Sequence, residues 1–161
     1  MKLKFVSDQQ FQLDAVASIT DIFQGQAVKQ ANFSVASTMD SGTQGELGYQ
    51  TELGYANKLD LLDDELLENI NHIQLCNGLP KSTDIQGRNF TVEMETGTGK
   101  TYVYIRTIYE LNKLYGFTKF IIVVPSVAIR EGVNKSLEIM EEHFKSLYEG
   151  ANCDYFIYDS S

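Results

Sequence analysis

Four stretches of this chain carry apolar residues at intervals of three and four, the period of an α-helix with one buried face. Such a pattern predicts amphipathic helices whose apolar stripes meet in a common core. The expected helices cover residues 8–24, 59–73, 100–115 and 133–147. Ser7 and Gln10 have the spacing of a capping box at the start of the first. The stripes consist of Ala15, Val16, Ile19, Ile22 and Phe23; Leu59, Leu62, Leu66, Ile70 and Ile73; Tyr104, Ile108, Leu111 and Tyr115; and Val133, Leu137, Met140, Phe144 and Leu147.

Three shorter segments have the composition of β-strands. Phe90, Val92 and Met94 alternate with polar residues over 89–94, as in a half-buried strand. Residues 119–125 contain a continuous apolar run that suits a parallel strand buried on both faces, and residues 154–159 provide a third segment. Because strands and helices alternate along the second half of the chain, we expect an α/β fold with a parallel sheet, right-handed crossovers and flanking helices.

A phosphate-binding loop is predicted between the first strand and the third helix. The sequence Glu-Thr-Gly-Thr-Gly-Lys-Thr occupies residues 95–101. Gly97 and Gly99 let the backbone curl closely around phosphate oxygens, Lys100 can reach the β- and γ-phosphates, and the Thr101 hydroxyl can join the Mg²⁺ shell. The generic pattern has glycine where this chain has Met94. The alternative is a chance Gly/Thr-rich turn before a lysine, and the strand and helix on either side argue against it.

Residues 26–57 interrupt this order. They are rich in Gly, Ser, Thr, Gln and Asn and have no helical or strand period, so we interpret them as a surface loop inserted in the domain. A small hairpin and an interaction surface are the alternatives.

Composition narrows the class of protein. The 161 residues fit one domain or part of a larger one, and the net charge of −9 argues against a general electrostatic grip on nucleic acid. Neither a secretory signal nor an apolar run of membrane-spanning length is apparent, so no membrane partner is expected. Cys76 and Cys153 have no second ligand residue nearby, and we expect reduced thiols in a cytoplasmic protein.

Three segments together resemble the restriction (Res) subunit of type III restriction–modification enzymes, which is a superfamily 2 helicase-like translocase. They are residues 11–15, 90–101 and 122–133. The form Met-Glu-Thr-Gly-Thr-Gly-Lys-Thr, with Met94 in first place, is typical of that family. The resemblance implies a RecA-like P-loop NTPase in which residues 1–161 form the N-terminal part of the helicase ATP-binding domain.

The resemblance also implies an ATP and Mg²⁺ site. Gln12 matches the glutamine that recognises adenine, and an exposed helix glutamine is the alternative. The Walker A residues that would bind ATP are Thr96, Gly97, Thr98, Gly99, Lys100 and Thr101. Lys100 and Thr101 would have the catalytic roles, with Thr101 on the metal.

A DNA contact and two partners follow from the same resemblance. Pro125, Ser126 and Arg130 match the motif Ia residues that touch the DNA backbone in such motors, although Arg130 could instead pair with Glu131 or Glu138. The implied partners are double-stranded DNA and a methyltransferase (Mod) subunit. The implied activity of the whole enzyme is ATP-dependent cleavage of unmodified foreign DNA.

Hydrolysis needs groups that these residues lack. It requires an acidic residue on the metal, a group that orients water and usually an arginine finger. After Thr101 no Asp-Glu pair ends an apolar strand, and the family's nuclease domain is absent. We therefore expect the chain alone to bind nucleotide weakly and to be inactive as an enzyme. A non-motor P-loop module and a protein-interaction fragment are the alternative functions.

Overall fold

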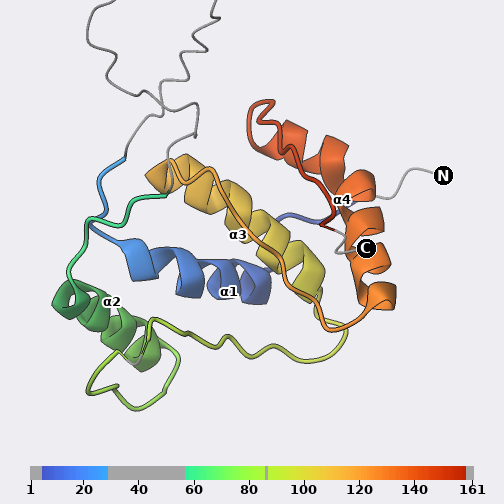
Figure 1. Ribbon diagram of the computed structural model, residues 1–161. Helices are drawn as coiled ribbons and strands as arrows, with labels where there is room; N and C mark the ends of the chain where they lie inside the picture. The colour runs from blue at the N-terminus through green and yellow to red at the C-terminus, as the bar shows by residue number, and fades with distance from the viewer. Residues whose placement is uncertain (1–4, 29–56, 86, 159–161) are drawn as a thin grey trace, which may run out of the picture.

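The computed structural model describes residues 5–28, 57–85 and 87–158 and forms a set of packed helices (Figure 1). The elements are α1 (Gln10–Thr20), the 3₁₀ turn η1 (Asp21–Phe23), α2 (Asp63–Cys76), α3 (Lys100–Tyr115) and α4 (Val127–Leu147). All four predicted helices are confirmed, with ends shifted by a few residues. The inserted segment predicted over residues 26–57 lies mostly outside the described residues.

Helix α3 lies between two other helices and organises the molecule (Figure 1). Helix α1 packs on one side of α3, and α4 packs on another. Helix α2 packs on η1, at the C-terminal end of α1. Seven residues of α3 are buried, on more than one face. Helix α3 therefore packs against both α1 and α4 and positions the segments that join its two ends.

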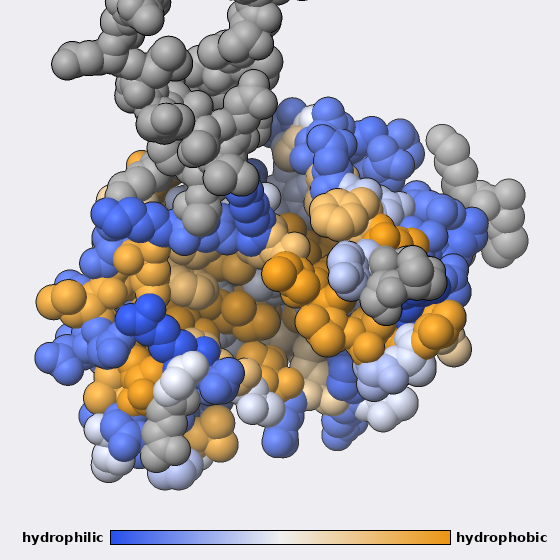
Figure 2. Space-filling model, viewed as in Figure 1, coloured by the Kyte–Doolittle hydropathy of each residue, from blue (hydrophilic) through white to orange (hydrophobic). Residues whose placement is uncertain are grey.

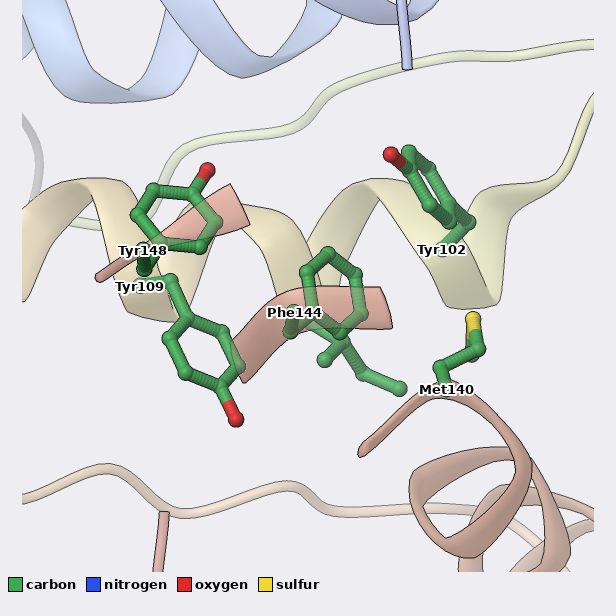
Figure 3. Packing of buried hydrophobic residues seen from close by; sticks show 6 residues of the cluster. Tyr102, Tyr109, Met140, Phe144 and Tyr148 are labelled. Atoms are coloured by element: carbon green, nitrogen blue, oxygen red, sulfur yellow. The ribbon is translucent and has the colours of Figure 1, made fainter. Parts of the chain in front are cut away.

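The contact between α3 and α4 is an aromatic core (Figure 3). The rings of Tyr109 and Phe144 are stacked with centroids 5.0 Å apart, and those of Tyr109 and Tyr148 are stacked at 5.1 Å. Ile105 and Phe144 are each only 1% exposed. Burial of side chains of this size dominates core energetics, and this cluster is the largest of the three in the described residues.

Two smaller clusters complete the packing. Ala15 and Val16 of α1 meet Val103 of α3, with Met94 against them. The other cluster holds η1 and α2 together through Ile22, Leu61 and Leu66, with partly buried neighbours that include Ile70 and Ile73. Each cluster uses residues from the stripes predicted from sequence or directly beside them.

The predicted parallel sheet is wrong. Residues 89–94, 119–125 and 154–158, hereafter the strand-like segments, contain no strand, and no strand occurs elsewhere in the described part of the chain. A β-strand exists only through backbone hydrogen bonds to a neighbouring strand, and none of the backbone bonds among the described residues joins two of these segments. Ile121 and Val123 are 90% and 86% exposed, so the expected burial on both faces is also absent. The described structure is helical rather than α/β or RecA-like.

The exposed strand-like segments place apolar side chains on the surface. Residues 119–125 and 154–158 run along one face of the molecule (Figure 1), and Figure 2 shows hydrophobic side chains gathered on that face. Phe156 and Tyr158 are 88% and 78% exposed. The composition of the strand-like segments favours an extended backbone, but it does not by itself provide a partner strand.

Details at the helix ends differ from the sequence prediction. Helix α1 has Gln9 as its N-cap and no side-chain capping bond, so the predicted capping box from Ser7 does not form. The Ser7 carbonyl instead accepts a hydrogen bond from Arg106 Nη1 at 2.5 Å. Ser7 is therefore held by a tertiary contact to α3 and does not cap α1. None of the helices in the described residues is sufficiently long and apolar to span a bilayer.

Candidate phosphate-binding loop

The predicted phosphate-binding loop connects the first strand-like segment to α3. Gly97 and Gly99 have φ angles of +83° and +86°, in the left-handed region that only glycine adopts without strain. Gly99 is the N-cap residue of α3. A Cβ at Gly99 would also lie 2.7 Å from Gln12 Nε2. The backbone conformation therefore favours glycine at position 99, and a Cβ there would also displace the end of the Gln12 side chain.

Unpaired backbone donors stand at the start of α3. The first bond of this helix joins the Val103 N–H to the Gly99 carbonyl at 3.0 Å. The N–H groups of Lys100, Thr101 and Tyr102 come before it and have no partner within the helix. Together with the helix dipole, such donors attract an anion such as a phosphate group.

Lys100 lies across the loop. Its Nζ donates to the Glu95 carbonyl at 2.5 Å, and the Thr98 hydroxyl donates to the same oxygen at 2.7 Å. These bonds close the loop on itself between Glu95 and the start of α3. Lys100 and Thr96 are exposed, whereas Thr101 is half-buried in the first turn of α3. An ammonium, glycine amides and a hydroxyl so placed form a donor set that fits a triphosphate and its Mg²⁺ ion.

Gln12 contacts this loop from α1. Its Nε2 donates to the Thr98 carbonyl at 2.9 Å, across 86 positions of sequence. The side chain is only 8% exposed, so the alternative of an exposed helix glutamine is wrong. The structure thus brings Gln12 together with the predicted Walker A residues. Its role toward adenine stays a prediction.

A polar cluster lies behind the loop between α3 and α4. Tyr102 Oη and His143 Nε2 are joined by a hydrogen bond of 3.0 Å. Burial raises the pKa of Tyr102, while burial and then the charge of Arg106 lower the pKa of His143. Burial thus favours the neutral form of both groups, and Tyr102 directly follows the predicted metal ligand Thr101. Sequence reasoning missed this cluster because His143 comes to Tyr102 from another helix, 41 positions away.

Two of the predicted DNA-contact residues have local partners in α4. The Ser126 hydroxyl accepts the Ile129 N–H at 3.3 Å and so caps α4. Arg130 Nη2 pairs with Glu131 Oε1 at 3.2 Å, which was one of the alternatives from sequence. A DNA role for Pro125, Ser126 and Arg130 stays a prediction.

A pocket of about 480 Å³ adjoins the loop on the side of α1. Glu95 and Thr98 of the loop line it, as do Phe11, Asp14 and Ser18 of α1. Sequence reasoning gave none of these three α1 residues a role in ligand binding. Their spacing of three and four, which places them on one helix face, was the available signal.

A glycine loop that leads directly into a helix beginning with Lys and Thr is the arrangement of phosphate-binding loops. The family model "Type III restriction enzyme, res subunit" matches residues 58–156, which is more than half of the chain. The chain therefore belongs to the type III restriction enzyme Res subunit family. The matched residues contain α2, the loop, α3 and α4, whereas Gln12 lies outside them.

Three curated relatives agree with this assignment. The chain is 41% identical over 97 residues to the Res subunit of the type III restriction-modification enzyme EcoP15I of Escherichia coli, covering 57% of this chain and 10% of that protein. It is 40% identical over 97 residues to the EcoPI Res subunit of Escherichia phage P1, again covering 57% and 10%. It is 42% identical over 85 residues to the StyLTI Res subunit of Salmonella typhimurium, covering 52% and 9%. The chain thus spans about a tenth of the length of these relatives.

Proposed function

We propose that this chain provides the nucleotide-binding segment of a type III restriction subunit, with ATP and Mg²⁺ as its ligands. The loop at residues 95–101 would hold the triphosphate. Lys100 would leave the Glu95 carbonyl to contact the β- and γ-phosphates, and the Thr101 hydroxyl would contact the metal. The magnesium ion, when bound, would neutralise charge on the phosphates.

One observation carries this proposal, namely the conformation of the loop at the start of α3. Left-handed glycines at positions 97 and 99, free N–H groups at the first turn and the Lys100 ammonium all lie within a few residues. Membership of the Res subunit family supports the same ligand. A non-motor P-loop module would have the same three features, and membership of the Res subunit family is what favours a restriction subunit.

The wider activity rests on the relatives. Their names describe restriction-modification enzymes, and we propose that a longer Res subunit containing this segment works on double-stranded DNA together with a methyltransferase (Mod) subunit. DNA cleavage would belong to that whole enzyme. Predicted DNA contacts of this segment are limited to Pro125, Ser126 and Arg130.

A nucleotide-binding experiment tests the proposal. A fluorescent ATP analogue would be titrated with the 161-residue chain in the presence of Mg²⁺. Lys100→Ala should weaken binding by at least about tenfold, because a charge-assisted bond to phosphate is lost. Lys135→Ala is the matched control, since Lys135 is an exposed lysine that pairs only with Glu138 on the surface of α4. Equal binding by wild type and Lys100→Ala would refute the proposal.

Turnover provides a separate test. The chain has no Asp-Glu pair at the end of an apolar segment after Thr101, so we expect nucleotide binding without efficient hydrolysis. Phosphate release would be measured with the wild-type chain and Lys100→Ala. Hydrolysis by the wild-type chain that Lys100→Ala abolishes would contradict this part of the proposal and leave the binding part intact.

A further inference from the structure

Two of the strand-like segments present large apolar side chains to solvent on the same side of the molecule. Residues 119–125 and 154–158 run along that side (Figure 1), where Figure 2 shows hydrophobic side chains gathered. The most exposed of these side chains, hereafter the apolar face, are Ile121, Val123, Phe156 and Tyr158, with exposures between 78% and 90%. Single exposed apolar residues are common, but a gathered set of this kind indicates a contact site.

The exposure of these segments alternates along the chain. Successive side chains of an extended backbone point to opposite sides. Phe156 and Tyr158 are 88% and 78% exposed, whereas Tyr155 and Ile157 are 46% and 42% exposed. The same alternation occurs over residues 121–123, in which the middle residue is the least exposed at 37%. In each segment, one set of side chains is therefore directed into solvent and the other is partly covered by the molecule.

The apolar face carries no charge. Residues 120–124 and 155–158 contain no Asp, Glu, Lys or Arg, although the chain as a whole has a net charge of −9. A partner that binds through ion pairs would find no counterpart on this face. An identical uncharged face needs no charge pairing, and a two-fold contact brings the same surface of both copies together. The absence of charge from these residues therefore favours a second copy of this chain over an acidic or basic partner.

The size of the apolar face fits a weak dimer. An aromatic side chain buries about 150–250 Å², and an Ile or Val side chain buries about 100 Å². Two copies would together remove about 1,000 Å² from water, which is the lower end of specific protein interfaces. Association should therefore occur at high protein concentration and be absent from dilute solution.

We propose that the apolar face is a self-association surface, through which two copies of this chain pack about a two-fold axis. The four exposed side chains of each copy would then be covered by the same four of the other copy. The net charge of −9 on each copy opposes the contact. The dimer is therefore stabilised by apolar burial and weakened by charge repulsion, and nucleotide binding has no part in it.

Sedimentation velocity of the 161-residue chain tests this contact. Between about 1 µM and about 500 µM, the sedimentation coefficient should rise from that of a monomer to that of a dimer and no further. Raising the salt concentration from about 0.05 M to about 0.5 M should strengthen the dimer at least about twofold, because salt screens the repulsion between two acidic copies. Association through ion pairs would be weakened by the same change, and that result would overturn the proposal.

Two variants locate the contact. Phe156→Ser and Ile121→Ser each remove one exposed apolar side chain per copy, and therefore two per dimer. Each should weaken dimerisation at least about tenfold. Leu79→Ser is the matched control and should leave dimerisation unchanged, because Leu79 is 55% exposed and lies outside both segments. All three variants should unfold like the wild type in dilute solution, since these side chains are exposed in the monomer.

Other results would overturn the proposal. A chain that stays monomeric over the whole concentration range would leave another part of a longer Res subunit as the occupant of the apolar face. Species that grow without limit would indicate open strand addition at unpaired backbone edges and contradict a closed two-fold contact. Equal dimerisation by the wild type, Phe156→Ser and Ile121→Ser would place the contact elsewhere, as would equal weakening by Leu79→Ser.

Discussion

The helices and the strand-like segments of this chain differ in where their backbone hydrogen bonds go. A helix forms its bonds between residues four apart, so a short stretch of sequence contains both partners. A strand needs a second segment at the correct distance and register. Helix α4 packs Met140 and Phe144 at 4% and 1% exposure, whereas Val123 and Phe156 in the strand-like segments are 86% and 88% exposed. The same apolar content therefore stabilises this molecule only where a packing partner is present.

The largest effect should come from the helical core. Phe144→Ala removes a ring that contacts Tyr102, Tyr109 and Tyr148. We expect a loss of about 3–5 kcal/mol in the free energy of unfolding, from lost transfer energy and the cavity left behind. Denaturant unfolding followed by circular dichroism would measure it. Phe144→Leu is the control and should lose clearly less, and a loss below about 1 kcal/mol for Phe144→Ala would show that this interface is not the core.

A smaller effect is expected where a strand-like segment meets α3. Gly99→Ala forces a left-handed φ on alanine and sets its Cβ against Gln12 Nε2, so we expect a loss of about 1–2 kcal/mol. The double variant with Gln12→Ala separates the two causes. Removing the Gln12 amide relieves the steric part only, so the double variant should recover part of the loss. Full recovery would mean that the φ angle carries no strain.

A still smaller effect should appear as a pH dependence of the free energy of unfolding, caused by His143 in the α3–α4 interface. Burial and the Arg106 charge lower the pKa of His143 from its ordinary value of 6.5, and Tyr102 and Arg106 of α3 and the Phe5 ring are the groups close to it. The unfolded chain therefore binds a proton at His143 more readily than the folded chain. This contribution to stability is complete above pH 6.5 and falls as the pH drops toward the lower folded value.

The variant His143→Gln isolates that contribution. Unfolding would be measured at about pH 7.5 and about pH 5.5 for wild type and variant, on either side of the unperturbed histidine value. Wild type should lose more stability than the variant on acidification, since the carboxylates titrate alike in both proteins. An identical loss would contradict the lowered pKa of His143.

The smallest effect should come from the strand-like segments themselves. Phe156→Ser removes a ring of the same size as that of Phe144 but one that is 88% exposed. We expect a change within about 0.5 kcal/mol, as for surface positions in general. The pair Phe144→Ala and Phe156→Ser thus tests the comparison directly. A loss from Phe156→Ser that approaches that of Phe144→Ala would show that residues 154–158 are packed in solution.

The candidate site also combines local features, which the sequence predicted, with long-range contacts, which periodicity and spacing could not predict. The order of Gly97, Gly99, Lys100 and Thr101 is local, so sequence was enough to predict a loop at the start of a helix, and the structure places it there. The contact from Gln12 spans 86 positions, and only a family resemblance pointed to it. The pocket could not be predicted, because Asn77 and Glu95 come to Asp14 from other parts of the chain.

Sequence by itself determined the four helices and the glycine loop, because the hydrogen bonds of a helix and the φ angles of a glycine turn depend on neighbouring residues. Three other features depend on the tertiary structure: the unpaired state of the strand-like segments, the contact of Arg106 with the Ser7 carbonyl, and the placement of Gln12 against Thr98. Each of these depends on which distant group comes within hydrogen-bonding distance. A periodic pattern in one segment carries no information about that distance.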